Sequence, residues 1–247
     1  MIIQSSWELK SIKQLPTLSK DALHIWRTRI SKNIKNIDYN WSLLTQNEQI
    51  HSKKFSFIKE QNRYIITRAI LREIISGYID TAPQNIFFKY TEYGKPYLAN
   101  NHEQKLKFNL AHSGDCIVFI FSKYIDIGID IEFINKELTI KDTIKYCCSE
   151  KEQHTLYVLP DYQKFHYFYK LWVIKEALVK AIGLGLSCDL RKININLNNK
   201  SHYPMNIKHN NIDYTINTFR AYNEYYSAFA VNKPIHKISF LTYEIYP

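Results

Sequence analysis

The sequence predicts an α+β fold of two similar α/β lobes related by pseudo-two-fold symmetry, each a small, mostly antiparallel sheet packed with helices. Short apolar runs bounded by turn residues are typical of strands, and capping-box patterns followed by apolar stripes are typical of helices. The order of these elements in the first half recurs in the second. We place the boundary at residue 123, giving lobes at 1–123 and 124–247 with the functional site at their interface.

In the first half, residues 1–20 are expected to form a strand and its connection. Thr45-Gln46-Asn47-Glu48 matches a capping box, which predicts a helix start. A second helix is predicted from the apolar stripe Ile66, Ile70, Ile74 and Tyr78. Strands are then predicted at 86–90, 106–108 and 116–121, with turn residues at 92–96.

In the second half, residues 122–126 are expected to turn a hairpin from the 116–121 strand into a strand around Asp130. Ser149-Glu150-Lys151-Glu152 is another capping box, and a long helix is predicted from about Asp161 to Ile182, ended by Gly183. Closing strands are predicted at 192–197, 214–219, 226–231 and 237–243. No residue-level repeat accompanies this likeness between the halves.

Composition indicates a folded protein with acidic partners. Hydrophobic residues make up 45% of the 247 residues, with only 6 Gly and 7 Pro. The formal net charge of +10 favours nucleic acid, an anionic membrane surface, phosphorylated small molecules or an acidic protein. No basic run marks a nucleic-acid-binding arm.

Cysteine usage and hydropathy indicate the compartment. The four cysteines include no CxxC pair, which predicts reduced thiols. The N-terminus lacks the pattern of a signal peptide, and the most apolar segment, 116–133, carries too many charges to span a bilayer. We therefore expect a cytoplasmic protein that makes no membrane contact.

Two carboxylates lie on one apolar strand. In Ile127-Gly128-Ile129-Asp130-Ile131-Glu132, side chains two apart share a face, so Asp130 and Glu132 point the same way. Such a pair is costly to desolvate unless a cation joins it, and Mg²⁺ suits carboxylates that also meet a phosphate. A solvent-facing edge strand with two ordinary acids is the alternative. Glu152 is a third candidate metal ligand, although its capping box already explains a carboxylate there.

The long helix of the second half sets Trp172, Glu176 and Lys180 on one stripe. A Glu–Lys pair four apart is common on solvated helices, but this helix is apolar nearly all round, so a buried pair needs partners. His112 follows an apolar strand, and Ser113 with the next glycine forms a donor-rich corner that a phosphate could approach.

Taken in order, four segments resemble the 4′-phosphopantetheinyl transferases of the surfactin-synthetase-activating type. They are Tyr93-Gly94-Lys95-Pro96, Phe108-Asn109-Leu110-Ala111-His112-Ser113-Gly114, Gly128-Ile129-Asp130-Ile131-Glu132, and Trp172-Val173-Ile174-Lys175-Glu176-Ala177 with Lys180. They span roughly 45–186, and the chain length suits the monomeric class rather than the short trimeric carrier-protein synthases.

The resemblance implies an enzyme that moves the phosphopantetheine arm of coenzyme A onto a serine of an acidic apo acyl or peptidyl carrier protein, releasing adenosine 3′,5′-bisphosphate. It implies a nucleotide side in the N-terminal lobe, and magnesium with the catalytic helix in the C-terminal lobe. It assigns Asp130, Glu132 and Glu152 to Mg²⁺, Glu176 to deprotonating the serine, with a metal contact left open as a second role, and Lys180 to the leaving phosphate. The coenzyme A contacts it implies are Arg63, Lys95, Pro96, His112, Ser113, Lys175 and Lys180.

The chain departs from the family pattern at Ala111, where a hydroxyl residue is common, and at Val173, where a small polar residue is usual. The basic residues His51, Lys53 and Lys54 align only loosely. Two other classes stay open: a magnesium-dependent nuclease or phosphohydrolase, which leaves the Gly94-Lys95-Pro96 turn unexplained, and a non-catalytic nucleic-acid-binding protein, which does not explain the cluster of acids.

Overall fold

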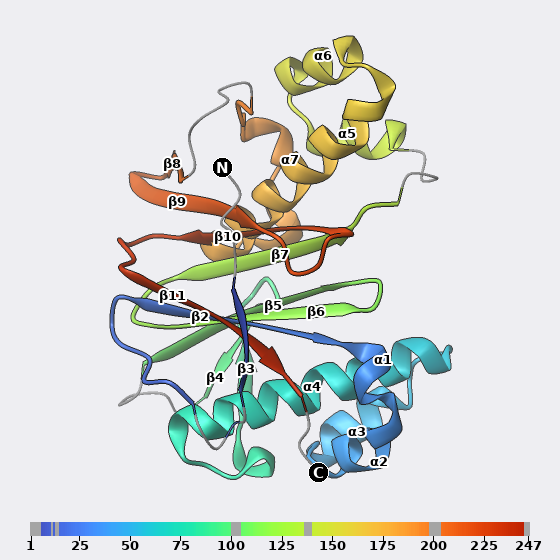
Figure 1. Ribbon diagram of the computed structural model, residues 1–247, viewed down its shortest axis with the longest axis vertical. Helices are drawn as coiled ribbons and strands as arrows, with labels where there is room; N and C mark the ends of the chain where they lie inside the picture. The colour runs from blue at the N-terminus through green and yellow to red at the C-terminus, as the bar shows by residue number, and fades with distance from the viewer. Residues whose placement is uncertain are drawn as a thin grey trace.

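The computed structural model describes residues 6–10, 12, 15–99, 105–135, 140–197 and 204–244. Two stacked sheets lie between two layers of helices (Figure 1). The first sheet has five strands, in the order β1 (Trp7–Lys10), β11 (Lys237–Tyr243), β2 (Ala22–Arg29), β6 (Cys116–Lys123) and β5 (Leu106–Ser113). Pairing is parallel from β1 through β11 to β2 and antiparallel from there to β5, so the sheet is mixed.

The second sheet is antiparallel throughout and contains β7 (Ile127–Phe133), β10 (Tyr225–Val231), β9 (Ile212–Phe219) and β8 (Met205–His209). A two-stranded ribbon, β3 (Phe88–Tyr90) with β4 (Pro96–Leu98), lies apart from both sheets.

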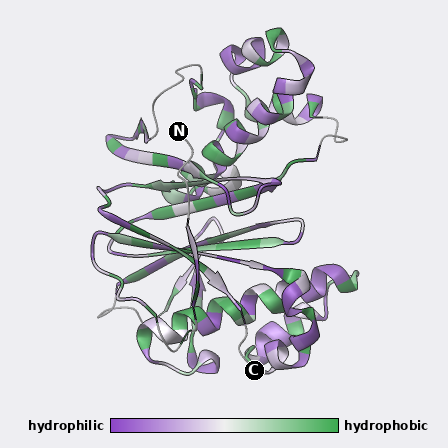
Figure 2. Ribbon diagram, in the orientation of Figure 1, coloured by the Kyte–Doolittle hydropathy of each residue, from purple (hydrophilic) through white to green (hydrophobic). Residues whose placement is uncertain are grey.

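The helices all lie on the outer sides of the two sheets (Figure 1). They are α1 (Ile30–Asn33), α2 (Ile37–Ser42), α3 (Gln46–Ser52), α4 (Ile58–Ile79), α5 (Lys141–Cys147), α6 (Glu150–Val158) and α7 (Asp161–Ile182). Helix α4 lies against the first sheet and α7 against the second (Figure 1). Figure 2 shows hydrophobic and hydrophilic stretches alternating along these helices, as expected when one side of a helix faces a sheet.

Three apolar layers fill the space between these elements. Ile66 and Ile70 of α4 pack with Phe119 and Phe121 of β6, and Ile174 and Leu178 of α7 pack on the second sheet. A middle layer between the sheets contains alternate residues of β6 and β7. Because strand side chains alternate between faces, β7 turns its isoleucines toward this middle layer and its carboxylates toward α7.

The predicted fold class is confirmed, as are several individual elements. Helix α7 begins at Asp161 and ends at Ile182, and Gly183 follows it in the left-handed conformation at φ 86°. Both capping boxes are complete, with each Ser or Thr side chain bonded to the third backbone amide and the third residue's carboxylate bonded back. All four cysteines are free. No helix in the described part of the chain is both long and apolar enough to cross a membrane.

Other predictions of local structure were wrong. The 122–126 segment does not turn a hairpin, because both edges of β6 are occupied by β2 and β5, and the chain leaves through Tyr124 at φ 66° to pair β7 with β10. Residues 192–197 form no strand; a 3-10 turn, η5 (Leu190–Lys192), leads into irregular chain. Strand β5 continues to Ser113, well beyond the predicted end at residue 108.

The two sheets do not divide at one point in the sequence. The last strand, β11, belongs to the second half of the chain but pairs with β2 in the first sheet. The functional division into lobes at 1–123 and 124–247 stays a prediction.

Candidate active site

Helix α7 packs unusually close to β7 at Gly128. A Cβ atom at this position would lie 2.1 Å from the carbonyl oxygen of Ala177 and 2.3 Å from the backbone nitrogen of Ala181. No side chain larger than hydrogen fits in that space. Gly128 therefore allows the last turns of α7 to lie directly on the strand that carries the two acids.

This approach brings Lys180 of α7 onto Asp130 of β7. The Lys180 Nζ lies 2.6 Å from Asp130 Oδ1, and Asp130 is only 4% exposed. Burial raises the pKa of Asp130, and Lys180 opposes that rise. The pKa of Lys180 is itself raised: burial disfavours the ammonium, but Asp130, Glu176 and Glu132 together outweigh it.

Glu132 lies near this pair and is hydrogen bonded to Ser113 of β5, a strand of the first sheet. Burial, and then the charge of Asp130, raise the pKa of Glu132 to about 7. Hydrogen bonds from Ser113 and Trp172 act in the opposite direction, and Ser113 Oγ donates to Glu132 Oε2 at 2.7 Å. The predicted shared face of Asp130 and Glu132 is thus correct, and their mutual repulsion is part of the electrostatics of the site.

Glu176 completes what we call the carboxylate cluster, defined as Asp130, Glu132 and Glu176 with Lys180. Burial and the negative charge of Asp130 raise the pKa of Glu176, and Lys180 lowers it. The charges of three carboxylates thus act on one ammonium. That excess of acid is unfavourable in a partly buried site unless protons or a cation neutralise it.

The carboxylate cluster has the chemistry of a cation site. Asp130 Oδ2 is buried and has no hydrogen-bond partner among the described residues. A hard divalent ion accepts such an oxygen, together with water and phosphate oxygens. In the described part of the chain, no three His, Cys, Asp or Glu residues are already arranged around one metal position. The residues fit magnesium by type, burial and charge.

Two of the coenzyme A contacts that the resemblance implies, Arg63 and His112, line a cavity of about 280 Å³ beside α4. We call these two residues the phosphate corner. His112 lies at the end of β5, and the pKa of its ring is lowered to about 4 by desolvation, Arg63 and Lys180, in that order. Arg63 forms an ion pair with Glu60. Basic side chains of α4, β5 and α7 thus influence one another here, and a bound phosphate would favour the protonated form of the His112 ring.

Of the loosely aligned basic residues, His51 lies near this cavity. The ring of His51 is 5.6 Å from that of Phe55 and 5.0 Å from that of Tyr64, and both aromatic residues line the cavity. Lys53 instead lies over the ring of Trp41, 5.7 Å from its centroid.

Glu152 and Lys175 are bound to each other, apart from the carboxylate cluster. Lys175 Nζ donates to Glu152 Oε2 at 2.5 Å and to two backbone carbonyl groups, and it is 0% exposed. Glu152 also accepts from the backbone nitrogens of Ser149 at 2.6 Å and Ile195 at 2.7 Å. All three ammonium protons and both carboxylate oxygens therefore have partners within the fold. The resemblance assigned Glu152 to the same metal ion as Asp130 and Glu132. The structure instead pairs Glu152 with Lys175.

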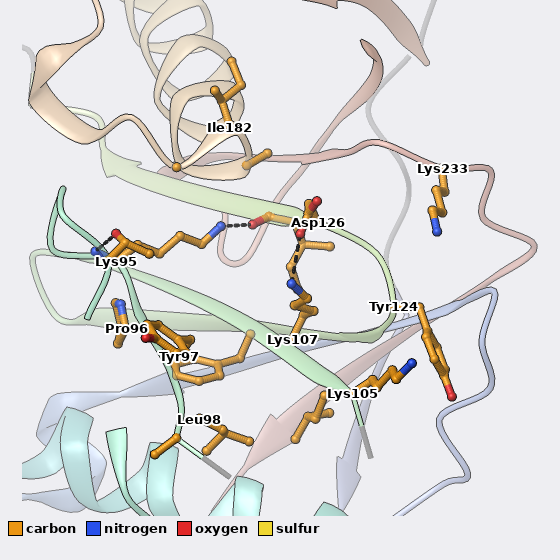
Figure 3. Close-up of a pocket in the computed structure, with 17 residues that line it drawn as sticks. Lys95, Pro96, Tyr97, Leu98, Lys105, Lys107, Tyr124, Asp126, Ile182 and Lys233 are labelled. Carbon is orange, nitrogen blue, oxygen red and sulfur yellow. Dashed lines mark hydrogen bonds and ion pairs between the residues drawn. The ribbon is translucent and has the colours of Figure 1, made fainter. Parts of the chain in front are cut away.

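Lys95 and Pro96 line a cavity of about 840 Å³ between the β3–β4 ribbon, the start of β5 and the end of α7 (Figure 3). Lys95 Nζ donates to the carbonyl oxygens of Ile127, at 2.9 Å, and Lys180, at 2.6 Å. Burial lowers the pKa of Lys95 to about 8. In this arrangement the Lys95 ammonium ties the ribbon to β7 and α7 instead of pointing into open space.

Gly128 and Asn109 occur in the family-like segments but were not among the predicted functional residues. Gly128 could have been suspected because it interrupts an apolar strand directly before two acids. Asn109 is the one amide side chain of β5, and it proves to be buried with its Oδ1 accepting from the backbone nitrogen of Ile129 at 2.9 Å.

With this geometry established, comparison with known proteins defines the class. Residues 126–230 match the family model of the 4′-phosphopantetheinyl transferase superfamily, and residues 25–123 match that of the 4′-phosphopantetheinyl transferase N-terminal domain. The chain belongs to the phosphopantetheinyl transferase family.

Individual relatives narrow the class. The chain is 32% identical to the 4′-phosphopantetheinyl transferase HetI of Nostoc sp., over 69% of this chain and 73% of that protein. It is 31% identical to a 4′-phosphopantetheinyl transferase of Bacillus subtilis, over 74% and 79%, and 28% identical to Sfp of Bacillus subtilis, over 70% and 79%. It is a transferase of the Sfp-like type. The comparisons give no support to the nuclease or phosphohydrolase alternative. Membership of a transferase family also argues against a non-catalytic nucleic-acid-binding protein.

Proposed function

We propose that this chain transfers the 4′-phosphopantetheine group of coenzyme A to a serine of an apo carrier protein, with Mg²⁺ held by Asp130, Glu132 and Glu176. The observation that carries the metal assignment is the Oδ2 atom of Asp130, which is buried within the carboxylate cluster and has no hydrogen-bond partner among the described residues. In this proposal Glu176 replaces Glu152 as the third metal ligand that the family resemblance implied. The charge of Asp130 acts on Glu176, whereas the oxygens of Glu152 already bind an ammonium and two backbone amides.

The two clusters of charge match the two anionic parts of coenzyme A. The phosphate corner supplies Arg63 and His112 for the 3′-phosphate, and the carboxylate cluster with Lys180 receives the diphosphate. Bound magnesium would neutralise negative charge on that diphosphate, as is usual in phosphoryl transfer. We assign Lys95 and Pro96 to the wall of the nucleotide site, and Ser113 to orienting Glu132, since its hydroxyl already donates to that carboxylate.

In the proposed reaction, the serine hydroxyl oxygen of the carrier forms a bond to the phosphorus that carries the pantetheine arm. The bond from that phosphorus to the bridging oxygen of the diphosphate breaks, and adenosine 3′,5′-bisphosphate leaves. Glu176 accepts the serine proton, directly or through a water. Lys180 donates a hydrogen bond or a proton to the oxygen that leaves.

The partner and the setting are also proposals. A net charge of +10 favours an acidic acyl or peptidyl carrier protein. Four free cysteines support a cytoplasmic location. We propose that the enzyme acts as a monomer, because each half of the site comes from the same chain, and that nucleic acid and membranes are not partners.

Mass spectrometry tests the reaction most simply. A panel of apo acyl and peptidyl carriers is incubated with coenzyme A, Mg²⁺ and one enzyme preparation, and the carrier that is served gains the phosphopantetheine mass. Thermal stabilisation of the enzyme by coenzyme A with Mg²⁺, compared with an oligonucleotide, is the accompanying binding assay. A preference for the oligonucleotide and no mass gain on any carrier would refute the proposal.

A further inference from the structure

The two sheets meet where β5 and β7 lie side by side, yet these strands belong to different sheets. Side chains of the first half hydrogen bond to the free edge of β7 in place of a neighbouring strand. The bonds run from Lys95 Nζ to the Ile127 oxygen at 2.9 Å, from the Ile129 nitrogen to Asn109 Oδ1 at 2.9 Å, and from the Phe133 nitrogen to Ser113 Oγ at 3.1 Å. We call these three side chains the seam.

Asn109 is the middle member of the seam and the one least involved in other tasks. It is 6% exposed, and its partner, Ile129, directly precedes Asp130. Lys95 also binds the end of α7, and Ser113 also donates to Glu132. A change at Asn109 therefore alters the seam without removing a group assigned to the ligand.

The seam lies between the two halves of the proposed ligand site. The phosphate corner belongs to α4 and β5, whereas the carboxylate cluster belongs to β7 and α7. Coenzyme A carries a 3′-phosphate and a diphosphate whose separation is limited by the ribose that joins them, so a single molecule is expected to span both halves. Its affinity then depends on how accurately the two halves are spaced, because the second contact is intramolecular once the first has formed.

We propose that Asn109 is a positioning residue that sets the spacing between the phosphate corner and the carboxylate cluster, and so controls the affinity for a ligand that spans both. The inference rests on the proposed function. It differs from a general role in stability because it concerns only ligands that reach both halves. A ligand that occupies one half is expected to bind independently of Asn109.

The test compares Asn109→Leu with the wild-type chain by calorimetry, using one spanning ligand and two fragments. Leucine fills nearly the same volume but offers no acceptor to the Ile129 amide. The spanning ligand is coenzyme A with Mg²⁺, and the fragments are adenosine 3′-monophosphate and pyrophosphate with Mg²⁺. We expect coenzyme A to bind roughly tenfold more weakly, the scale of one lost hydrogen bond, and each fragment to change by less than about twofold.

Two further variants control for folding. Asn109→Asp keeps an acceptor oxygen in the same place and is expected to lose less coenzyme A affinity than Asn109→Leu. Asn232→Ala is the second control. The Asn232 side chain also accepts a hydrogen bond from a backbone amide next to β7, that of Asp126 at 3.0 Å, but Asn232 follows β10, the neighbour of β7 within the second sheet. This control is expected to bind all three ligands as the wild-type chain does.

Unchanged coenzyme A affinity in Asn109→Leu, or an equal loss for coenzyme A and both fragments, would overturn the inference while leaving the proposed function standing. A wild-type chain that binds neither the fragments nor coenzyme A would overturn the proposed function, and the inference with it.

Discussion

Replacing Gly128 with alanine tests whether the close approach of α7 to β7 builds the site. The added Cβ would lie 2.1 Å and 2.3 Å from backbone atoms of α7, compared with an ordinary contact of at least 3.4 Å, so the strand and the helix must separate by about 1 Å. Overpacking of this kind costs about 1–3 kcal/mol, which for a chain of this size lowers the melting temperature by roughly 2–12 °C.

The same displacement acts on chemistry more strongly than on stability. Lys180 and Glu176 lie on the part of α7 that must move, whereas Asp130 stays on β7. A 1 Å misplacement of a catalytic group can cost on the order of 10²-fold in rate. We therefore expect Gly128→Ala to fold, to melt at a lower temperature, and to modify apo carrier about 10²-fold more slowly at saturating coenzyme A.

Gly77→Ala is the matched control. A Cβ there would also be too close, at 2.4 Å from Leu15 Cδ1, but that neighbour is the end of a flexible side chain in a different region of the molecule. Thermal melts and single-turnover carrier modification are measured on both variants. A Gly128→Ala enzyme with wild-type rate and melting temperature would refute the idea that backbone contact at this glycine positions the catalytic helix.

Three other variants separate the roles of the charged groups. Glu176→Gln is expected to lower kcat by about 10²–10⁴-fold with little change in melting temperature, and a wild-type rate by mass spectrometry would remove Glu176 from its role as base. Glu152→Gln is expected to bind Mg²⁺ and coenzyme A as the wild-type chain does. Its unfolding free energy in urea should fall by about 3–5 kcal/mol, because Lys175 is left buried without its carboxylate partner. A stable variant that no longer binds Mg²⁺ would contradict this expectation. Burial, with a smaller effect of Lys237, lowers the pKa of His24 from 6.5 to about 4, so the unfolded chain binds that proton first. The unfolding free energy contributed by His24 is thus complete above pH 6.5 and falls by about 3 kcal/mol as the pH drops to 4; His24→Gln should flatten that part of the urea-unfolding profile, and an unaltered slope would exclude His24 as the source.

Local sequence patterns predicted those elements that depend on local interactions. Both capping boxes and the full length of α7 follow from contacts within a few residues of the chain, so the sequence contains their determinants. The shared face of Asp130 and Glu132 follows from strand geometry alone. The catalytic stripe of Glu176 and Lys180 follows from helical period in the same way.

What could not be predicted depends on partners distant in sequence. Strand β2 lies inside the five-stranded sheet and is buried on both faces, so it lacks the alternation that marks a half-exposed strand. The expected hairpin after β6 failed because β2 occupies the edge that β7 would have needed. Glu152 had two competing uses in the sequence, and only the fold shows that Lys175 binds it.

The most direct test of the account is the position of the metal. Crystals soaked with coenzyme A and Mn²⁺, a substitute for Mg²⁺ with a usable anomalous signal, should show one anomalous peak in contact with Asp130 Oδ2 and shared by Glu132, Glu176 and the diphosphate. A peak at Glu152, or a bound diphosphate whose metal touches none of the three clustered acids, would contradict the account.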